Sequence, residues 1–242
     1  MNITTLKVTR NEQIASDVYR MVLAGDVPEL AAGSFVELSV PNCYLRRPFS
    51  VCASDEGTLT LIYKVVGRGT DLMSHFPVGT EVETIAGLGQ GFHVERSNHA
   101  ALLVGGGLGV APLYQLARVL RKQGVSCTVV AGFNRTEDAF LKAEFEELGC
   151  DVRMVTMDGS SGRKGLVTDH LDGIVHDYFY SCGPLPMLKA LQTALTSNGD
   201  LSLEARMGCG YGACMGCTIQ TVNGPKRVCK EGPVFEKEEV IW

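Results

Sequence analysis

The feature that most constrains this chain is a set of four cysteines near its C-terminus, Cys209, Cys214, Cys217 and Cys229, set among glycines. The spacing Cys-x4-Cys-x2-Cys with one later cysteine is that of ligands to a two-iron, two-sulfur cluster. Glycines let the backbone turn tightly around such a cluster and aim its amides inward. A structural zinc site would present two Cys-x2-Cys pairs and this chain has one, so zinc is the less favoured alternative.

The remaining composition describes an ordinary globular chain. Its other five cysteines are scattered singly, which is typical of reduced thiols and not of a disulfide framework. The N-terminus lacks the pattern of a signal peptide, so we expect a cytoplasmic protein. No apolar run reaches the roughly 18 residues that a membrane span needs. A net charge of -5 without a basic run argues against nucleic acid as a partner.

The first hundred residues carry short β-rich segments separated by turn residues. Several alternate polar and apolar side chains with a period of two, which predicts half-buried antiparallel strands and, at this regular spacing, a small barrel over residues 1–98. One helix is expected from Gly69 to Phe76, capped by Thr70 or Asp71. The expected strands are Thr4–Thr9, Val18–Leu23, Phe35–Val40, Thr58–Val66 and Glu81–Ile85.

Two polar groups stand out in this barrel. In Arg46-Arg-Pro-Phe-Ser50, Arg47 is suited to clamp a phosphate and Ser50 to bond a ring nitrogen. In Gly67-Arg-Gly-Thr70, backbone amides can face a pyrophosphate. Each group taken alone has a simpler interpretation, as a basic strand end at the surface and as a common glycine turn.

From Ala100 onward, apolar strands alternate with helical stretches, which predicts a parallel sheet with crossover helices over residues 99–200. A small iron–sulfur module then occupies residues 201–242. The chain is therefore a multi-domain protein of the α+β and α/β classes. The expected elements are strands Ala101–Val104, Val125–Gly132, Asp151–Met157 and Tyr178–Ser181, and helices from Pro112 to about Lys122, Glu137–Leu148 and Leu185–Ser197.

Two loops follow strands of this sheet. The first, with Gly105, Gly106, Gly107 and Gly109, departs from Gly-x-Gly-x-x-Gly because Pro112 takes the third position. The second is Cys182-Gly183-Pro184, which alone is equally well read as an ordinary strand-to-helix turn. Because ligands of open α/β sheets sit at the carboxyl ends of strands, the two loops are expected to converge on one nucleotide crevice.

Taken together, Arg-Pro-Phe-Ser, the Gly-x-Gly-x-x-Pro loop, Cys-Gly-Pro and the terminal cysteines resemble the ferredoxin reductase superfamily along essentially the whole chain. The tail from Glu204 to Phe235 is similar to that of one branch, the electron-transfer subunits of B-type dihydroorotate dehydrogenases. The resemblance implies FAD on the barrel, a nicotinamide nucleotide on the two loops and a 2Fe-2S cluster on the four cysteines. The implied FAD contacts are Arg47, Pro48, Phe49, Ser50, Ile62, Tyr63, Lys64, Gly69 and Thr70, with Ser50 near the flavin N5 and Arg47 near the pyrophosphate.

The resemblance also implies a function. Electrons would pass two at a time between NAD(H) and FAD, and singly between FAD and the cluster. The partner would be an FMN-containing catalytic subunit that oxidises dihydroorotate in pyrimidine biosynthesis, in a heterotetramer with two copies of each chain. No side chain is expected to act as acid or base, so the five histidines are interpreted as surface or structural residues.

Two alternatives remain open. A related subunit of an NADPH–ferredoxin oxidoreductase complex would carry similar cysteines, and Arg135 is suited to accept a 2′-phosphate that Glu137 or Asp138 would repel. Family resemblance favours NAD over NADP. The alternative of another class is a non-catalytic scaffold protein with a zinc site.

Overall fold

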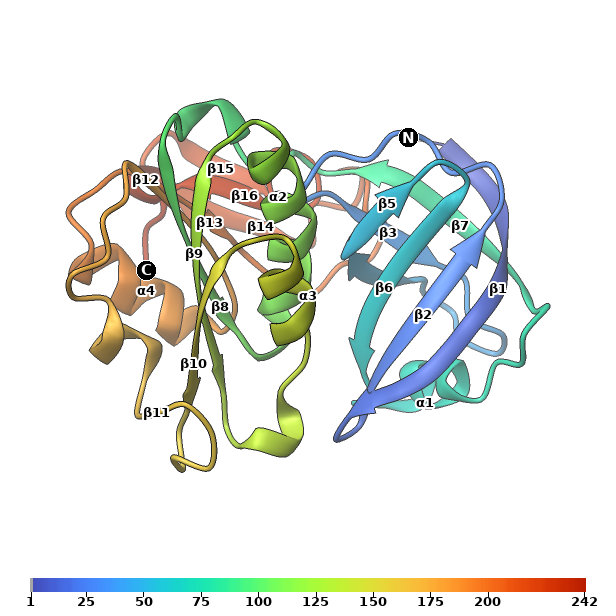
Figure 1. Ribbon diagram of the computed structural model, residues 1–242. Coiled ribbons are helices and arrows are strands. Elements are labelled where there is room, and N and C mark those ends of the chain that lie inside the picture. Colours follow the sequence, from blue (N-terminus) through green and yellow to red (C-terminus); the bar gives the residue numbers. More distant parts are fainter. Residues whose placement is uncertain (1) are drawn as a thin grey trace.

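The computed structural model describes residues 2–242 and sets an N-terminal barrel beside an α/β domain (Figure 1). A seven-stranded antiparallel sheet in the order β4-β3-β7-β1-β2-β6-β5 curves into the barrel, as predicted. Its apolar residues alternate inward and form one core. The strands are β1 (Asn2–Ala15), β2 (Val18–Ala24), β3 (Phe35–Leu38), β4 (Arg47–Ser50), β5 (Ala53–Asp55), β6 (Thr58–Lys64) and β7 (Glu81–Leu88).

The barrel helix α1 (Arg68–Ser74) begins one residue before the predicted start, and its N-cap residue differs from the prediction. The N-cap residue is Gly67. Thr70 lies inside the first turn, where its hydroxyl accepts hydrogen bonds from the amides of Val66 (2.9 Å) and Gly67 (3.3 Å). Thr70 therefore contributes to capping the helix start, as predicted for one of the two candidates, although the N-cap position itself belongs to Gly67 and not to Thr70 or Asp71.

The second sheet has the order β11-β10-β9-β8-β12-β13-β16 and is parallel except for β16, which runs antiparallel to β13. Parallel strands buried on both faces explain the near-continuous apolar runs of the sequence. The strands are β8 (Ala100–Gly106), β9 (Ser126–Phe133), β10 (Asp151–Thr156), β11 (Arg163–Lys164), β12 (Tyr178–Cys182), β13 (Gly199–Ser202) and β16 (Val234–Glu236).

Helices cover both faces of this sheet. Helices α2 (Val110–Lys122) and α3 (Lys142–Glu147) lie on the face toward the barrel, and α4 (Leu185–Ala194) lies on the other (Figure 1). The predicted helix 137–148 is wrong in extent. A 3-10 turn at Thr136–Asp138 comes first, and Leu141 then takes a left-handed φ of 65° before α3 begins. This break allows Phe140 and Leu141 both to enter the apolar core.

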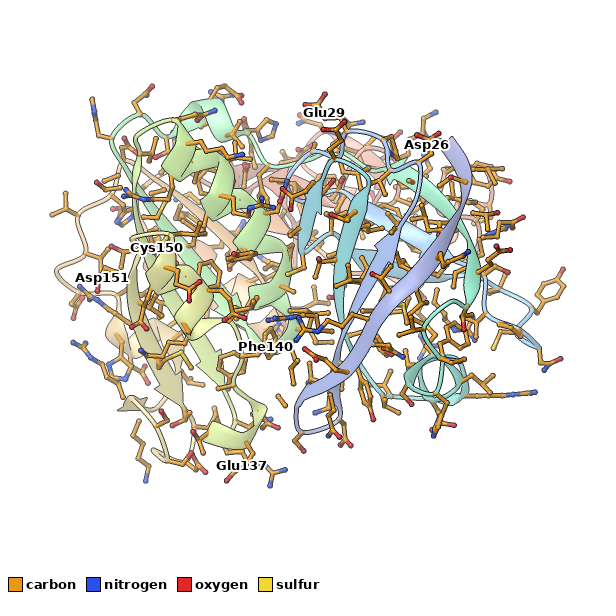
Figure 2. The ribbon with its side chains drawn as sticks, turned by 45° about the vertical axis from the view of Figure 1, so that its right-hand side comes forward. Asp26, Glu29, Glu137, Phe140, Cys150 and Asp151 are labelled. Carbon is orange, nitrogen blue, oxygen red and sulfur yellow. The ribbon has the colours of Figure 1, made fainter. Side chains whose placement is uncertain are left out.

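The barrel and the α/β domain share that core. Val18 and Ile62 of the barrel belong to the same buried cluster as the apolar face of α2, and Phe140 lies at the boundary of the two bodies (Figure 2). Arg20 of β2 forms an ion pair with Glu144 of α3. These contacts fix the orientation of the barrel against the nucleotide domain.

The C-terminal segment packs against the α/β domain and adds a strand to its sheet. Its hairpin, β14 (Thr218–Thr221) and β15 (Gly224–Arg227), stands apart, but β16 returns to the edge of the parallel sheet. The predicted division between residues 200 and 201 falls within β13. Val228 and Phe235 pack in the same core as α4. Within residues 2–242, no helix combines the length and apolar character that crossing a membrane requires.

Candidate functional site

Two cavities meet where the barrel faces the α/β domain. One, of about 390 Å³, lies over the carboxyl ends of β8, β9 and β12, and the other, of about 320 Å³, lies against the barrel. Lys64 and Leu108 line both. A molecule in one cavity is therefore a direct neighbour of a molecule in the other.

The barrel cavity gathers nearly all the residues expected to hold a flavin. Three segments far apart in sequence converge there because β4 and β6 contact each other and α1 follows β6. Gly69, the one expected residue that does not line the cavity, packs behind it. The expected residues on its wall are Arg47, Pro48, Phe49, Ser50, Ile62, Tyr63, Lys64 and Thr70.

The Arg47 guanidinium occupies space that a side chain at position 69 would fill. A methyl group there would lie 2.5 Å from the Arg47 Nε atom, so only glycine lets the guanidinium lie over the start of α1. Arg47 also donates a hydrogen bond to the Leu45 carbonyl. The cavity thus presents a fixed cation beside a polar turn, which fits a pyrophosphate.

The apolar wall of the barrel cavity is also fixed. The Phe49 and Tyr63 rings lie 5.8 Å apart and tilted, and the Tyr63 hydroxyl donates a 2.9 Å hydrogen bond to the Asn11 side chain. Burial raises the Tyr63 pKa, so the phenol stays neutral. Flat aromatic and apolar surfaces with one cationic end fit a dinucleotide that carries a ring system.

Sequence reasoning missed the far wall of this cavity, which comes from the C-terminal segment. Glu204, Ala205 and Met207 line it together with Ser202 and Leu203. The Glu204 side chain is exposed toward the cavity, and desolvation by the protein atoms near its carboxyl raises the pKa of that group. The resemblance of the tail that begins at Glu204 was the only available signal, because no local pattern assigns these residues to the barrel cavity.

Cys182 lies between the two cavities' walls. Cys182 lines the barrel cavity, whereas Pro184 of the same turn lines the other. Burial raises the Cys182 pKa to about 12, and the nearby Glu204 carboxylate adds to the rise. The Cys182 side chain is therefore a neutral thiol at the boundary.

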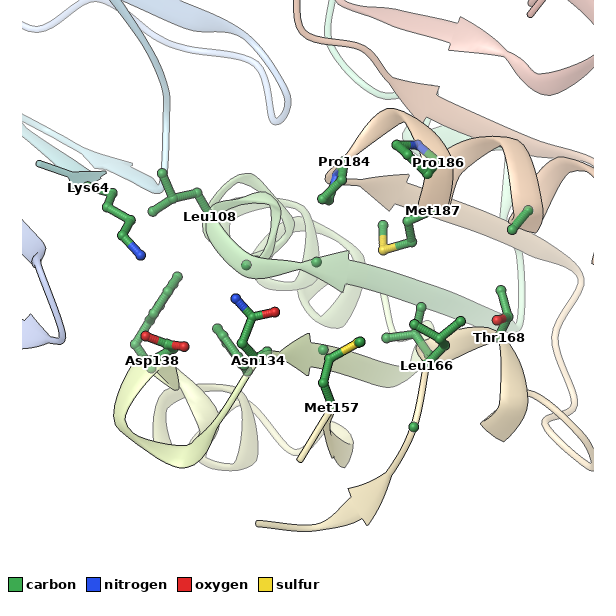
Figure 3. A pocket seen from close by; sticks show the side chains of 18 of the residues that line it. Lys64, Leu108, Asn134, Asp138, Met157, Leu166, Thr168, Pro184, Pro186 and Met187 are labelled. Carbon is green, nitrogen blue, oxygen red and sulfur yellow. The ribbon is translucent and has the colours of Figure 1, made fainter. Parts of the chain in front are cut away.

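The second cavity has the form of a nucleotide site. Gly106, Gly107 and Pro184 of the two predicted loops line it, with Asn134 and Asp138 opposite (Figure 3). Lys64 reaches in from the barrel, and Met187 of α4 closes the apolar side. The lining is mostly apolar with a few polar groups, which is the usual character of a cofactor site.

The two loops touch at Gly109, as their positions in the sheet predicted. A methyl group at Gly109 would lie 2.1 Å from the Cys182 carbonyl oxygen and 2.6 Å from the Gly183 nitrogen. Gly105 is also tightly enclosed, because a methyl there would lie 2.7 Å from Val110. These glycines therefore allow the backbones to pack together behind the cavity wall.

The polar group after β9 bears on the choice between NAD and NADP. The Arg135 Nε atom lies 3.8 Å from a Glu137 oxygen and 3.7 Å from an Asp138 oxygen. Two carboxylates therefore lie beside the cation that was expected to accept a 2′-phosphate, where they would repel that phosphate. This favours a nucleotide with a free ribose hydroxyl.

The four cysteines lie on a loop and on the adjoining hairpin. Backbone amides point at their sulfurs: Ala213 and Cys214 toward Cys209 Sγ (3.2 and 3.4 Å), and Cys229 toward Cys217 Sγ (3.4 Å). Desolvation opposes ionisation of Cys209, but the amides of the following loop outweigh it and lower its pKa to about 7. Burial and the adjacent Cys217 instead raise the pKa of Cys229 to about 12. Amides directed at cysteine sulfurs are a feature that 2Fe-2S sites use to hold thiolate ligands.

The cysteine loop is supported by Arg227, which is itself paired with Glu231. Arg227 of β15 donates a 2.7 Å hydrogen bond to the Gly212 carbonyl, and Glu231 accepts hydrogen bonds from the amide and the side chain of Arg227. Tyr211 and Met215, with exposed fractions of 49% and 54%, lie on the outer side of the loop. The loop is thus supported within the chain and open to solvent outside.

Two of the histidines, His93 and His176, form hydrogen bonds with neighbouring side chains of the α/β domain. The His93 Nδ1 atom lies 3.0 Å from the buried Asp200 carboxylate, and the His176 Nε2 atom lies 2.8 Å from the Ser197 hydroxyl. Neither lines a cavity described above. These hydrogen bonds are consistent with structural roles, and the absence of a catalytic role stays a prediction.

Known proteins are similar to this chain over nearly its whole length. The model of the iron-sulfur cluster binding domain of dihydroorotate dehydrogenase B matches residues 204–241, and that of the oxidoreductase NAD-binding domain matches residues 103–193. A solved structure of an NADH-dependent reduced ferredoxin-NADP oxidoreductase, studied for flavin-based electron bifurcation, superposes with a TM-score of 0.89 at 29% identity. It covers 98% of this chain and 90% of that one.

Two relatives are similar along their full length. The dihydroorotate dehydrogenase B (NAD(+)) electron transfer subunit of Fusobacterium nucleatum is 40% identical, with 99% of each chain covered. That of a Geobacillus species is 43% identical, with 98% of this chain and 97% of the relative covered. This chain therefore belongs to the family of dihydroorotate dehydrogenase B electron transfer subunits.

Proposed function

We propose that this chain carries electrons between NAD(H), an FAD in the barrel cavity and a 2Fe-2S cluster on Cys209, Cys214, Cys217 and Cys229. The observation that carries the proposal is the order of the three sites. The barrel cavity adjoins the nucleotide cavity at Lys64 and Leu108, and its far wall at Met207 lies two residues before Cys209. The flavin site thus lies between the electron donor and the cluster.

FAD, when bound, accepts electrons in a pair and releases them singly, which neither NAD nor the cluster does. The chain's own task is positioning. When FAD is bound, Arg47 would hold its pyrophosphate, Phe49 would contact the ring system and Ser50 would bond a ring nitrogen. Tyr63, buried in the barrel core, would support Phe49. Gly106, Gly107 and Pro184 would hold the nicotinamide nucleotide in the neighbouring cavity, and Gly105, Gly109 and Cys182 would support them from behind or from the side of the barrel cavity.

The partner we propose is an FMN-containing catalytic subunit that oxidises dihydroorotate, in an assembly with two copies of each chain. Family membership supports this partner, and the exposed outer side of the cysteine loop supports its docking there, with Tyr211 and Met215 in the contact. We place the complex in the cytoplasm, where cysteine ligands stay reduced. The amides directed at the sulfurs and the match to an iron–sulfur model favour this function over a zinc scaffold.

The test is reconstitution. The chain is co-expressed with an FMN-containing dihydroorotate dehydrogenase catalytic subunit, and the purified complex is assayed anaerobically for dihydroorotate-dependent reduction of NAD. The expected result is a complex that contains FMN, FAD and iron and reduces NAD. A matched complex carrying Cys214→Ser should oxidise dihydroorotate with an artificial acceptor but not with NAD. A colourless chain, or one that elutes apart from the flavoprotein, would contradict the proposal.

A second candidate, exchange between NADPH and ferredoxin, follows from the solved oxidoreductase of similar fold. Apparent affinities for NADH and NADPH separate the two. The ion pairs of Arg135 predict a preference for NADH, and the double variant Glu137→Gln, Asp138→Asn should raise the affinity for NADPH by freeing that cation. A wild-type preference for NADPH would favour the second candidate.

A further inference from the structure

A buried glutamate of the barrel faces the cysteine loop. Glu37 of β3 is 2% exposed, and a methyl group at Gly210 would lie 2.4 Å from its carboxyl carbon. Gly210 has a left-handed φ of 70° and directly follows Cys209. The loop therefore passes close over the Glu37 carboxyl group, and only glycine permits this approach.

The Glu37 carboxyl lacks the partners that a buried charge usually has. Among residues 2–242, the opposing charge that acts on it is that of Arg46, which itself forms an ion pair with Glu83. Desolvation outweighs this attraction and raises the Glu37 pKa. A buried carboxylate without a close partner costs stability, so a purely structural role would be served better by an apolar side chain.

Glu37 also lies beside the flavin site. Side chains two apart on a strand point to the same face, so Glu37 shares a face of β3 with Phe35, which lines the barrel cavity. Its register partner on β4 is Pro48, another lining residue. Glu37 is thus placed between the flavin wall and the cysteine loop.

We propose that the negative charge of Glu37 lowers the reduction potential of the cluster held by the neighbouring loop. The inference rests on the proposed cluster. Reduction adds one negative charge to an iron–sulfur cluster, and the potential of such a cluster depends on nearby charge. A carboxylate in a buried setting, poorly screened by solvent, disfavours that added electron. Glu37 therefore makes the reduced cluster a stronger electron donor.

The experiment is a redox titration of the cluster in the FAD-loaded chain, followed by the electron paramagnetic resonance signal of the reduced cluster. It is run at about pH 8.5, roughly four units above the ordinary pKa of glutamate. Wild type is compared with Glu37→Gln and Glu37→Met, which remove the charge at similar volume. Glu81→Gln is the matched control, because Glu81 is an exposed glutamate of the adjacent β7.

The expected result is a positive shift of the cluster potential in both Glu37 variants and none in Glu81→Gln. Unchanged potentials in Glu37→Gln and Glu37→Met would overturn the inference. Loss of the cluster from both variants, with FAD still bound, would also overturn it, since that would make Glu37 structural. A wild-type chain without the cluster signal would instead refute the proposed function, so the two failures are distinguishable.

Discussion

Replacing Gly109 by alanine tests how closely the two nucleotide loops must approach. Gly109 has an ordinary helical φ of -62°, so alanine there meets no backbone penalty. The added methyl would instead lie 2.1 Å from the Cys182 carbonyl oxygen. The glycine loop and the Cys182–Pro184 turn must separate by about 1 Å before this becomes a normal contact.

The magnitude follows from that displacement. Forcing an extra methyl into a packed site costs about 1–3 kcal/mol, which lowers the melting temperature of a chain this size by about 2–12 °C. A shift of about 1 Å in the loops that hold the nicotinamide nucleotide can slow the reaction by up to roughly 100-fold. Gly109→Ala should therefore lose both stability and the rate of flavin reduction by NADH.

Stopped-flow measurement of flavin absorbance after mixing with NADH provides the assay. Gly124→Ala is the control, because Gly124 has a φ of 83° with open space around its Cα atom, at the end of α2. Alanine there should cost on the order of 1–2 kcal/mol of stability through backbone strain and leave the rate unchanged. A Gly109→Ala protein that reduces its flavin at the wild-type rate would refute the reasoning.

Three further predictions concern the flavin and cluster sites. Cys214→Ser should abolish the visible absorption of the cluster and leave flavin reduction by NADH largely intact; equal loss of both would contradict separable sites. Arg47→Ala should weaken FAD retention about 10- to 100-fold, because a hydrogen-bonded charge contributes about 1.5–3 kcal/mol, and unchanged FAD content after gel filtration would count against it. Because the Glu204 pKa is raised in the folded state, its stabilising contribution is present at acidic pH and lost as pH rises through the folded value. Glu204→Gln should therefore melt higher than wild type at pH 8 and show no such gain at pH 4, by calorimetry.

Local patterns predicted most of the secondary structure. Period-two alternation identified β6, and the apolar runs identified β8, β9, β10 and β12 to within one or two residues. The pattern was wrong where burial overrode local preference. Residues 137–148 have helical composition, but Phe140 and Leu141 gain more by entering the shared core than by continuing a helix.

The site was predictable to the extent that its residues belong to compact motifs. Arg47–Ser50 and the glycine loop each lie within a few residues, so their chemistry is visible in sequence. Glu204 and Met207 carry no such pattern. They reach the barrel cavity only because β13 lies beside β12 in the sheet, which is a pairing between segments about twenty residues apart.

The sequence by itself indicated the four candidate cysteine ligands, the glycines that let their loop turn and the two loops proposed to hold a nucleotide, because spacing and backbone freedom are local properties. Tertiary structure alone decided that Lys64 belongs to two cavities, that β16 returns to the sheet of β13 and that Glu37 lies against Gly210. Each of these contacts joins strands or loops distant in sequence. Such contacts are set by packing the barrel and the α/β domain around one core, which no local pattern encodes.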